Sequence, residues 1–85
     1  MTIHIVLYWI AWLVEKYKMK KISVSLSGHQ TSISLEDEFA LALREIAKKR
    51  NVSVAALIAE IDDTRKLGEN LSSAIRVWIL NYFRK

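Results

Sequence analysis

The feature that most constrains the fold is a strict alternation of apolar and polar residues over positions 21–35. Over 21–27, isoleucine, valine and leucine alternate with serine, and Gly28 interrupts the pattern. Over 29–35 the alternation resumes, with Thr31, Ile33 and Leu35 on one face. A period of two is typical of a strand with one buried face, and a slip of one residue would exchange the two faces. The sequence therefore predicts half-buried strands here, the second at about 29–35.

The polar side of the second strand has an unusual composition. Its residues are Gln30, Ser32 and Ser34, which form hydrogen bonds but carry no charge. A surface strand that needs only solubility would more often carry lysine, glutamate or arginine. This face is therefore a candidate binding surface.

Three helices are expected after the strands, at about 36–50, 53–65 and 71–84. Three acidic residues over 36–38 suit the positive end of the first helix dipole, and Ser53 is a typical N-cap for the second helix. The expected fold class is mainly α with a short β ribbon. The order is strand, helix, helix and an additional C-terminal helix.

The third helix is apolar on most of its sides. Leu71, Ile75, Trp78 and Ile79 alone cover much of its circumference. Such a helix is buried on more than one side. The chain has 85 residues and no cysteine, so its thin core has no disulfide to support it. Both observations favour a homodimer.

Composition narrows the function. Thirteen basic residues oppose nine acidic ones, which gives a net charge of +4 and a pI near 9.6. A dimer doubles that charge and favours a polyanionic partner. The two histidines, His4 and His29, lie far apart, and neither a metal-binding spacing nor a nucleophile motif is present. We therefore expect no enzyme, no cofactor and no metal.

Residues 1–20 differ in composition from the remainder and are expected to lie outside the domain at 21–85. An apolar run spans 3–14, and four lysines follow it over 16–21. Twelve residues are too few to span a bilayer. Three interpretations remain: a short helix packed on the domain, an interfacial membrane anchor, or an extension upstream of a working start at Met19.

Several linked motifs over residues 20–84 occur in one order. They are Gly28–Glu36, Phe39, Leu43, Ile46-Ala47, Ser53–Leu57, Glu60–Asp62 and Asn70–Arg76. Together they resemble one branch of the ribbon-helix-helix family, which comprises short bacterial proteins with a third helix. The resemblance implies an intertwined homodimer whose two strands pair antiparallel into a ribbon that enters the major groove of DNA.

The resemblance also implies roles for individual residues. Gln30, Ser32 and Ser34 would contact base edges, and glutamine suits adenine, although members of this branch often have arginine at that position. Ser53 and the amides of the next two residues, Val54 and Ala55, would bind a DNA phosphate at the helix N-terminus.

The dimer core would contain twelve residues: Ile33, Leu35, Phe39, Leu43, Ile46, Leu57, Ile58, Ile61, Leu71, Ile75, Trp78 and Ile79. The expected function is that of a cytoplasmic, nucleoid-associated transcriptional regulator that binds double-stranded DNA as a homodimer. The alternatives are a protein-interaction module that has lost sequence-specific DNA binding, an antitoxin-type autorepressor, and a regulator tethered to a membrane by 3–14.

Overall fold

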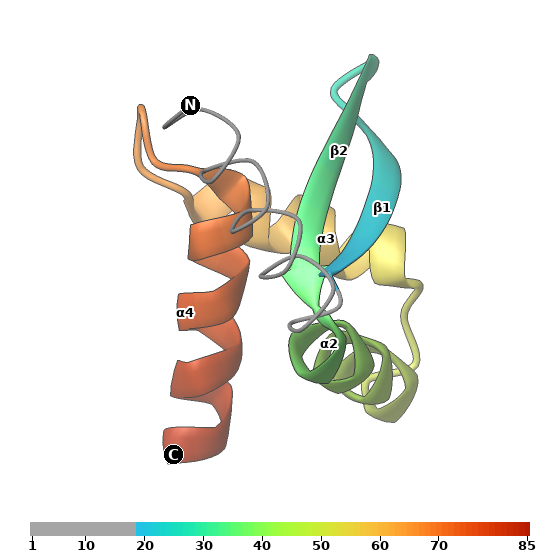
Figure 1. Cartoon of the computed structure of the whole chain (residues 1–85), viewed down its shortest axis with the longest axis vertical. Helices are drawn as coiled ribbons and strands as arrows, with labels where there is room; N and C mark the ends of the chain where they lie inside the picture. The colour runs from blue at the N-terminus through green and yellow to red at the C-terminus, as the bar shows by residue number, and fades with distance from the viewer. Residues whose placement is uncertain (1–18) are drawn as a thin grey trace, which may run out of the picture.

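The computed structural model describes residues 19–85 as a two-stranded ribbon followed by three helices (Figure 1). The elements are β1 (Met19–Leu26), β2 (His29–Glu36), α2 (Asp37–Lys49), α3 (Val54–Thr64) and α4 (Leu71–Arg84). This architecture is that of the predicted fold class. The apolar run at 3–14 lies outside the described residues.

The two strands form an antiparallel hairpin joined by a turn of two residues. Ser27 and Gly28 both have positive φ, at 51° and 80°. Two positive φ values are the signature of a type I′ turn, whose twist matches that of the strands it joins. Glycine adopts this backbone without strain. The turn sets a register in which Ile22 lies opposite Ile33 and Ser23 lies opposite Ser32.

Both strands of this ribbon belong to one chain. The family resemblance implies one strand from each protomer, whereas here β1 occupies one edge of β2. The other edge of β2 is partly covered by α4. The Ser34 N–H donates to Ser72 Oγ at 3.2 Å, and Arg76 Nη2 donates to the Ser34 carbonyl at 3.3 Å. A strand from a second chain could not pair with β2 at Ser34 without displacing these two contacts.

The connection between α2 and α3 is fixed at both the backbone and the side-chain level. Asn51 adopts a left-handed conformation with φ of 59°, and the Val52 N–H donates to the Ala47 carbonyl at 3.0 Å. This is a typical way to end a helix. Arg50 then donates two hydrogen bonds, of 2.8 and 2.9 Å, to the carboxylate of Glu60. This surface ion pair links the end of α2 to α3.

The hydrophobic core lies between the inner face of the hairpin and the three helices. Its largest fully buried side chains are Leu35, Leu43, Ile46, Leu57, Ile58, Ile61 and Ile75. Every residue expected in the dimer core is buried within this single chain, except Phe39 and Trp78, which pack against the core partly buried. Burial of these side chains therefore does not require a second chain.

The apolar residues of α4 that remain exposed are not those expected in the dimer core. Val77, Leu80 and Phe83 are 53%, 52% and 60% exposed, whereas Ile79 is only 3% exposed. Their spacing of three residues places them on one side of the helix. We call these three residues the α4 strip. It lies on the part of α4 that the chain's own core does not cover.

Candidate nucleic-acid interface

The outer face of the hairpin brings together the three residues expected to contact bases. Gln30, Ser32 and Ser34 are all exposed, because they alternate along β2 with the buried Ile33 and Leu35. The helices pack against the opposite face. The structure therefore presents these three polar side chains as one row on a solvent-accessible strand.

A second row of polar side chains from β1 lies beside the first. Lys21, Ser23 and Ser25 are exposed, and they lie opposite Ser34, Ser32 and Gln30 in that order. Directly opposite residues in an antiparallel pair have Cβ atoms about 5 Å apart, so the two rows form one continuous surface. We call these six residues the ribbon face.

The β1 row was not assigned to the site from the sequence. The alternation of serine with apolar residues over 21–27 was the available signal, because it predicts a polar outer face for this strand as well. The register could not be deduced, since it depends on which strand pairs with which. Lys21 gives the ribbon face a positive charge that the β2 row lacks.

The N-terminus of α3 has the form expected of an anion-binding helix end. Ser53 Oγ accepts a hydrogen bond from the Ala56 N–H at 3.0 Å, so this serine is the N-cap. The N–H groups of Val54 and Ala55 belong to the first turn, where no carbonyl within the helix can accept from them. Free amides and the helix dipole together attract negative charge.

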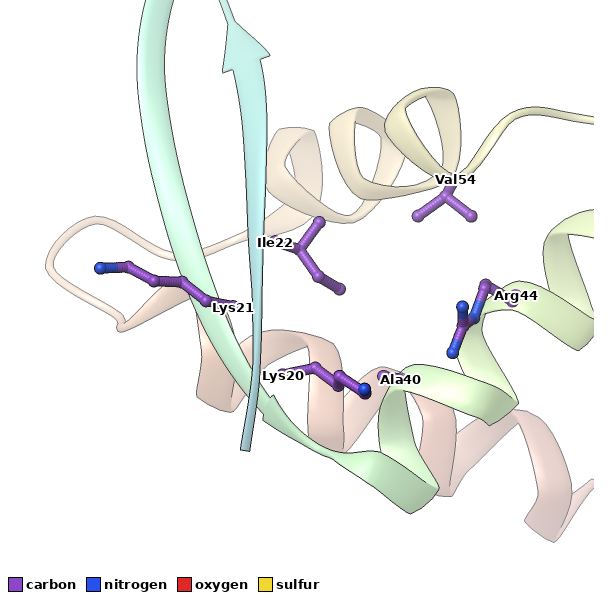
Figure 2. Close-up of a pocket in the computed structure, with 6 residues that line it drawn as sticks. All are labelled: Lys20, Lys21, Ile22, Ala40, Arg44 and Val54. Atoms are coloured by element: carbon purple, nitrogen blue, oxygen red, sulfur yellow. The ribbon is translucent and has the colours of Figure 1, made fainter. Parts of the chain in front are cut away.

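Two basic side chains flank this helix end. A cavity of about 340 Å³ lies between β1, α2 and α3, and Lys20, Ile22, Arg44 and Val54 are among the residues that line it. Figure 2 shows the Lys20 and Arg44 side chains on the cavity side of β1, whereas Lys21 points the other way. Lys20 and Arg44 are exposed, and neither forms an ion pair within residues 19–85. This positive surface was not predicted from the sequence.

An ion pair between the end of β2 and α4 fixes the base of the ribbon. Arg76 Nε donates to Glu36 Oε1 at 2.8 Å, and the same guanidinium reaches the Ser34 carbonyl. The hydrogen bond from Arg76 lowers the pKa of Glu36, and the guanidinium charge adds to the effect. Glu36 is thereby held ionised, and α4 is tied to the strand that carries the β2 row.

Other kinds of site find no support in the part of the chain that the structure describes. Residues 19–85 contain no group of histidine and acidic side chains placed to hold a metal ion. Within the same residues, no helix combines the length and the apolar character needed to cross a bilayer.

The family model described as the ribbon-helix-helix domain matches residues 19–83 of the chain. No curated protein and no solved structure matches the chain. The matched residues include both strands of the hairpin, α2 and α3, and all but the last residue of α4. The chain therefore belongs to the ribbon-helix-helix family.

Proposed function

We propose that this protein binds double-stranded DNA in a sequence-dependent manner and acts as a transcriptional regulator on the bacterial nucleoid. Members of the family are generally DNA-binding regulators or antitoxins, and they are typically not enzymes. The observation that carries the proposal is the exposed row formed by Gln30, Ser32 and Ser34. Glutamine can form two hydrogen bonds with adenine in the major groove, and serine can donate to or accept from any base.

A second set of groups would hold the DNA backbone. Ser53, with the free amides of Val54 and Ala55, would accept one phosphate. Lys20 and Arg44 beside this helix end add positive charge without a competing carboxylate partner in the described chain. Such contacts supply affinity and orientation, and base contacts supply specificity.

The protein would act as a homodimer. Members of this family generally dimerise. The α4 strip offers a second copy an apolar surface of more than half-exposed side chains, namely Val77, Leu80 and Phe83. Twofold-symmetric dimers are the commonest homo-oligomers, and in them the same surface patch of both subunits forms the interface.

The second candidate is a protein-interaction module without sequence-specific DNA binding. The α4 strip favours it, because an exposed apolar patch can equally receive an unrelated protein. An antitoxin that represses its own operon would combine both activities. The DNA-binding regulator would use the ribbon face to contact bases, whereas the protein-interaction module would not.

The test is a selection from random DNA duplexes, followed by titration of the wild type and Gln30→Ala at two salt concentrations. The wild type should enrich a motif and should bind more weakly at high salt, because counterions released from DNA contribute to the affinity. Gln30→Ala should weaken binding to the best duplex by about 10- to 100-fold and leave nonspecific binding nearly unchanged. Failure to enrich any motif would favour the protein-interaction module.

A further inference from the structure

We propose that the cavity between β1, α2 and α3 binds a small organic anion of the aliphatic carboxylate class, and that this ligand weakens DNA binding. The effect on DNA rests on the proposed function, because the ligand would occupy Lys20 and Arg44, the two cations assigned there to the DNA backbone. The binding site itself is independent of that function.

The inner wall of the cavity is apolar. Ile22 from β1, Ala40 from α2 and Val54 from α3 line it, and Figure 2 shows Ile22 and Val54 on two sides of this space. Its volume of about 340 Å³ lies at the lower end of the range for small-molecule sites, which are mostly apolar with a few polar groups that orient the ligand. A phosphate group gains nothing from an apolar wall, whereas a hydrocarbon chain gains by leaving water.

The exposed rim of the cavity is positively charged. Lys20 and Arg44 reach it from different elements, and none of the residues that line the cavity is acidic. The residues three and four positions from Arg44 on α2 include no carboxylate either, so its helix offers no partner. Two like charges beside one cavity repel each other, and an anion between them removes this repulsion. Arginine can bind a carboxylate through two parallel hydrogen bonds.

The apolar wall and the charged rim together define the ligand. An aliphatic carboxylate would place its chain against Ile22, Ala40 and Val54 and its charged group between Lys20 and Arg44. An inorganic anion would use only the rim, and a neutral apolar molecule would use only the wall. The site should therefore prefer a molecule that has both parts.

The cavity adjoins the groups proposed to hold a DNA phosphate. Val54 lines the cavity and also belongs to the first turn of α3. A carboxylate bound here would repel a phosphate at this helix end and would neutralise Lys20 and Arg44. Loss of cationic contacts weakens binding to every duplex. The motif should not change, because Lys21 and the rest of the ribbon face lie on the other side of β1.

The first test is an NMR titration of the full-length chain, without DNA, using hexanoate as the probe. Acetate lacks the apolar chain and 1-hexanol lacks the charge, so these two compounds are the matched ligand controls. Hexanoate should shift the amide signals of Ile22, Ala40 and Val54. Its Kd should be lower than that of either control by about 10-fold or more, because only hexanoate uses both the wall and the rim.

Two variants locate the site. Arg44→Ala should weaken hexanoate binding by about 10-fold, because it removes the strongest carboxylate partner. Lys49→Ala is the matched control, since it removes a positive charge from the exposed end of the same helix and does not line the cavity. Circular dichroism checks that both variants are folded. Equal hexanoate and acetate affinities, signal shifts confined to other residues, or an unchanged affinity of Arg44→Ala would overturn the ligand site.

The second test repeats the DNA titration with the selected duplex in the presence of saturating hexanoate. The wild type should lose about 10-fold in affinity, and Arg44→Ala should lose less. Hexanoate binding that leaves DNA affinity unchanged would overturn the regulatory role. A duplex selection that enriches no motif, with hexanoate still bound in the cavity, would overturn the proposed function and leave the ligand site standing.

Discussion

The Ser53 side chain has a structural role as a helix cap and a proposed role in binding phosphate. Its hydroxyl caps α3 by accepting from the Ala56 N–H, and the same helix end is proposed to bind a phosphate. Replacement by alanine would not separate the two roles, because loss of an N-cap by itself costs about 1 kcal/mol of stability. Weaker DNA binding could then result from either effect. Asparagine and aspartate cap helices about as well as serine, and they differ from each other in charge.

We therefore predict that Ser53→Asn and Ser53→Asp have nearly wild-type thermal stability and differ in DNA binding. The carboxylate of Ser53→Asp would repel the phosphate, so binding to all duplexes should fall by about 10-fold, with no change in motif. Ser53→Asn, the neutral control, should bind within a few-fold of the wild type. Equal affinities for the two variants would exclude a phosphate at this helix end. Thermal unfolding and titration at one salt concentration decide the outcome.

Arg76 connects α4 to the end of β2 through Glu36, whose pKa it lowers. A carboxyl group with a lowered pKa in the folded state stabilises the protein above its usual pKa of 4.5. This contribution is lost as the pH falls through the pKa of the folded state. Both side chains are 29% exposed, so solvent screens the pair and limits its value to about 0.2–1 kcal/mol.

We predict that Arg76→Ala lowers the free energy of unfolding at pH 7, as measured by urea denaturation. The difference from the wild type should narrow as the pH falls through the lowered pKa of Glu36, because protonation of Glu36 removes the charge that Arg76 binds. Glu36→Gln is the matched control, and combining the two substitutions should cost less than the sum of the single effects. A deficit for Arg76→Ala that is independent of pH would assign its role to the Ser34 carbonyl alone.

At the level of elements, the structure pairs β1 with β2 of the same chain. Ser23 and Ser32 are directly opposite within the chain. In a ribbon of two β2 strands with its twofold axis at Ser32, the two Ser32 side chains would instead lie opposite each other. Cysteines can report the difference, because the protein has none of its own.

We predict that the double variant Ser23→Cys/Ser32→Cys forms a disulfide within one chain on mild oxidation. Opposite positions of a hairpin lie within the distance that a disulfide spans. Ser25→Cys/Ser34→Cys is the matched control, since these positions are each opposite another residue and should remain reduced. Mass spectrometry after alkylation measures both. Covalent dimers formed by Ser32→Cys alone would contradict the single-chain ribbon.

The sequence predicted the fold well where periodicity acts locally. The alternation over 29–35 and the capping serine of α3 are local signals, and both elements are present in the structure. Strand pairing is not local. The same alternation over 21–27 is compatible with pairing to β2 of its own chain or of a second chain, and only the Ser27-Gly28 turn favours the former. The cavity beside Val54 could not be predicted without knowing which strand pairs with β2, because β1 brings Lys20 to this cavity.

At the level of the whole molecule, the α4 strip determines how two chains could associate. The sequence predicted an interface on α4 and named Trp78 and Ile79 within it. Within the single chain, Ile79 is 3% exposed and packs in the core, and Trp78 stacks on Tyr82 with ring centroids 5.6 Å apart. A helical wheel cannot distinguish the side that faces the core from the side that faces a partner, because both sides are apolar. The arrangement of the other elements decides it.

We predict that the wild type is dimeric at micromolar concentration and that Leu80→Glu dissociates it, raising the dimer Kd by about 100-fold or more. A symmetric interface would bury the introduced carboxylate twice without a partner. Leu67→Glu is the control, because Leu67 is fully exposed in the loop before α4 and should not affect association. Analytical ultracentrifugation checks both variants. A folded wild-type monomer at this concentration would refute the dimer.

A hairpin contained in one chain also changes how the protein can diverge. In a ribbon made of two identical strands, every substitution occurs twice, so both halves of the binding site must change together. Here β1 and β2 are encoded separately, and a single codon change at Lys21 or Gln30 alters one end of the ribbon face only. Duplicated copies of such a gene can therefore change one strand of the ribbon face at a time, each step preserving the side chains of the other strand.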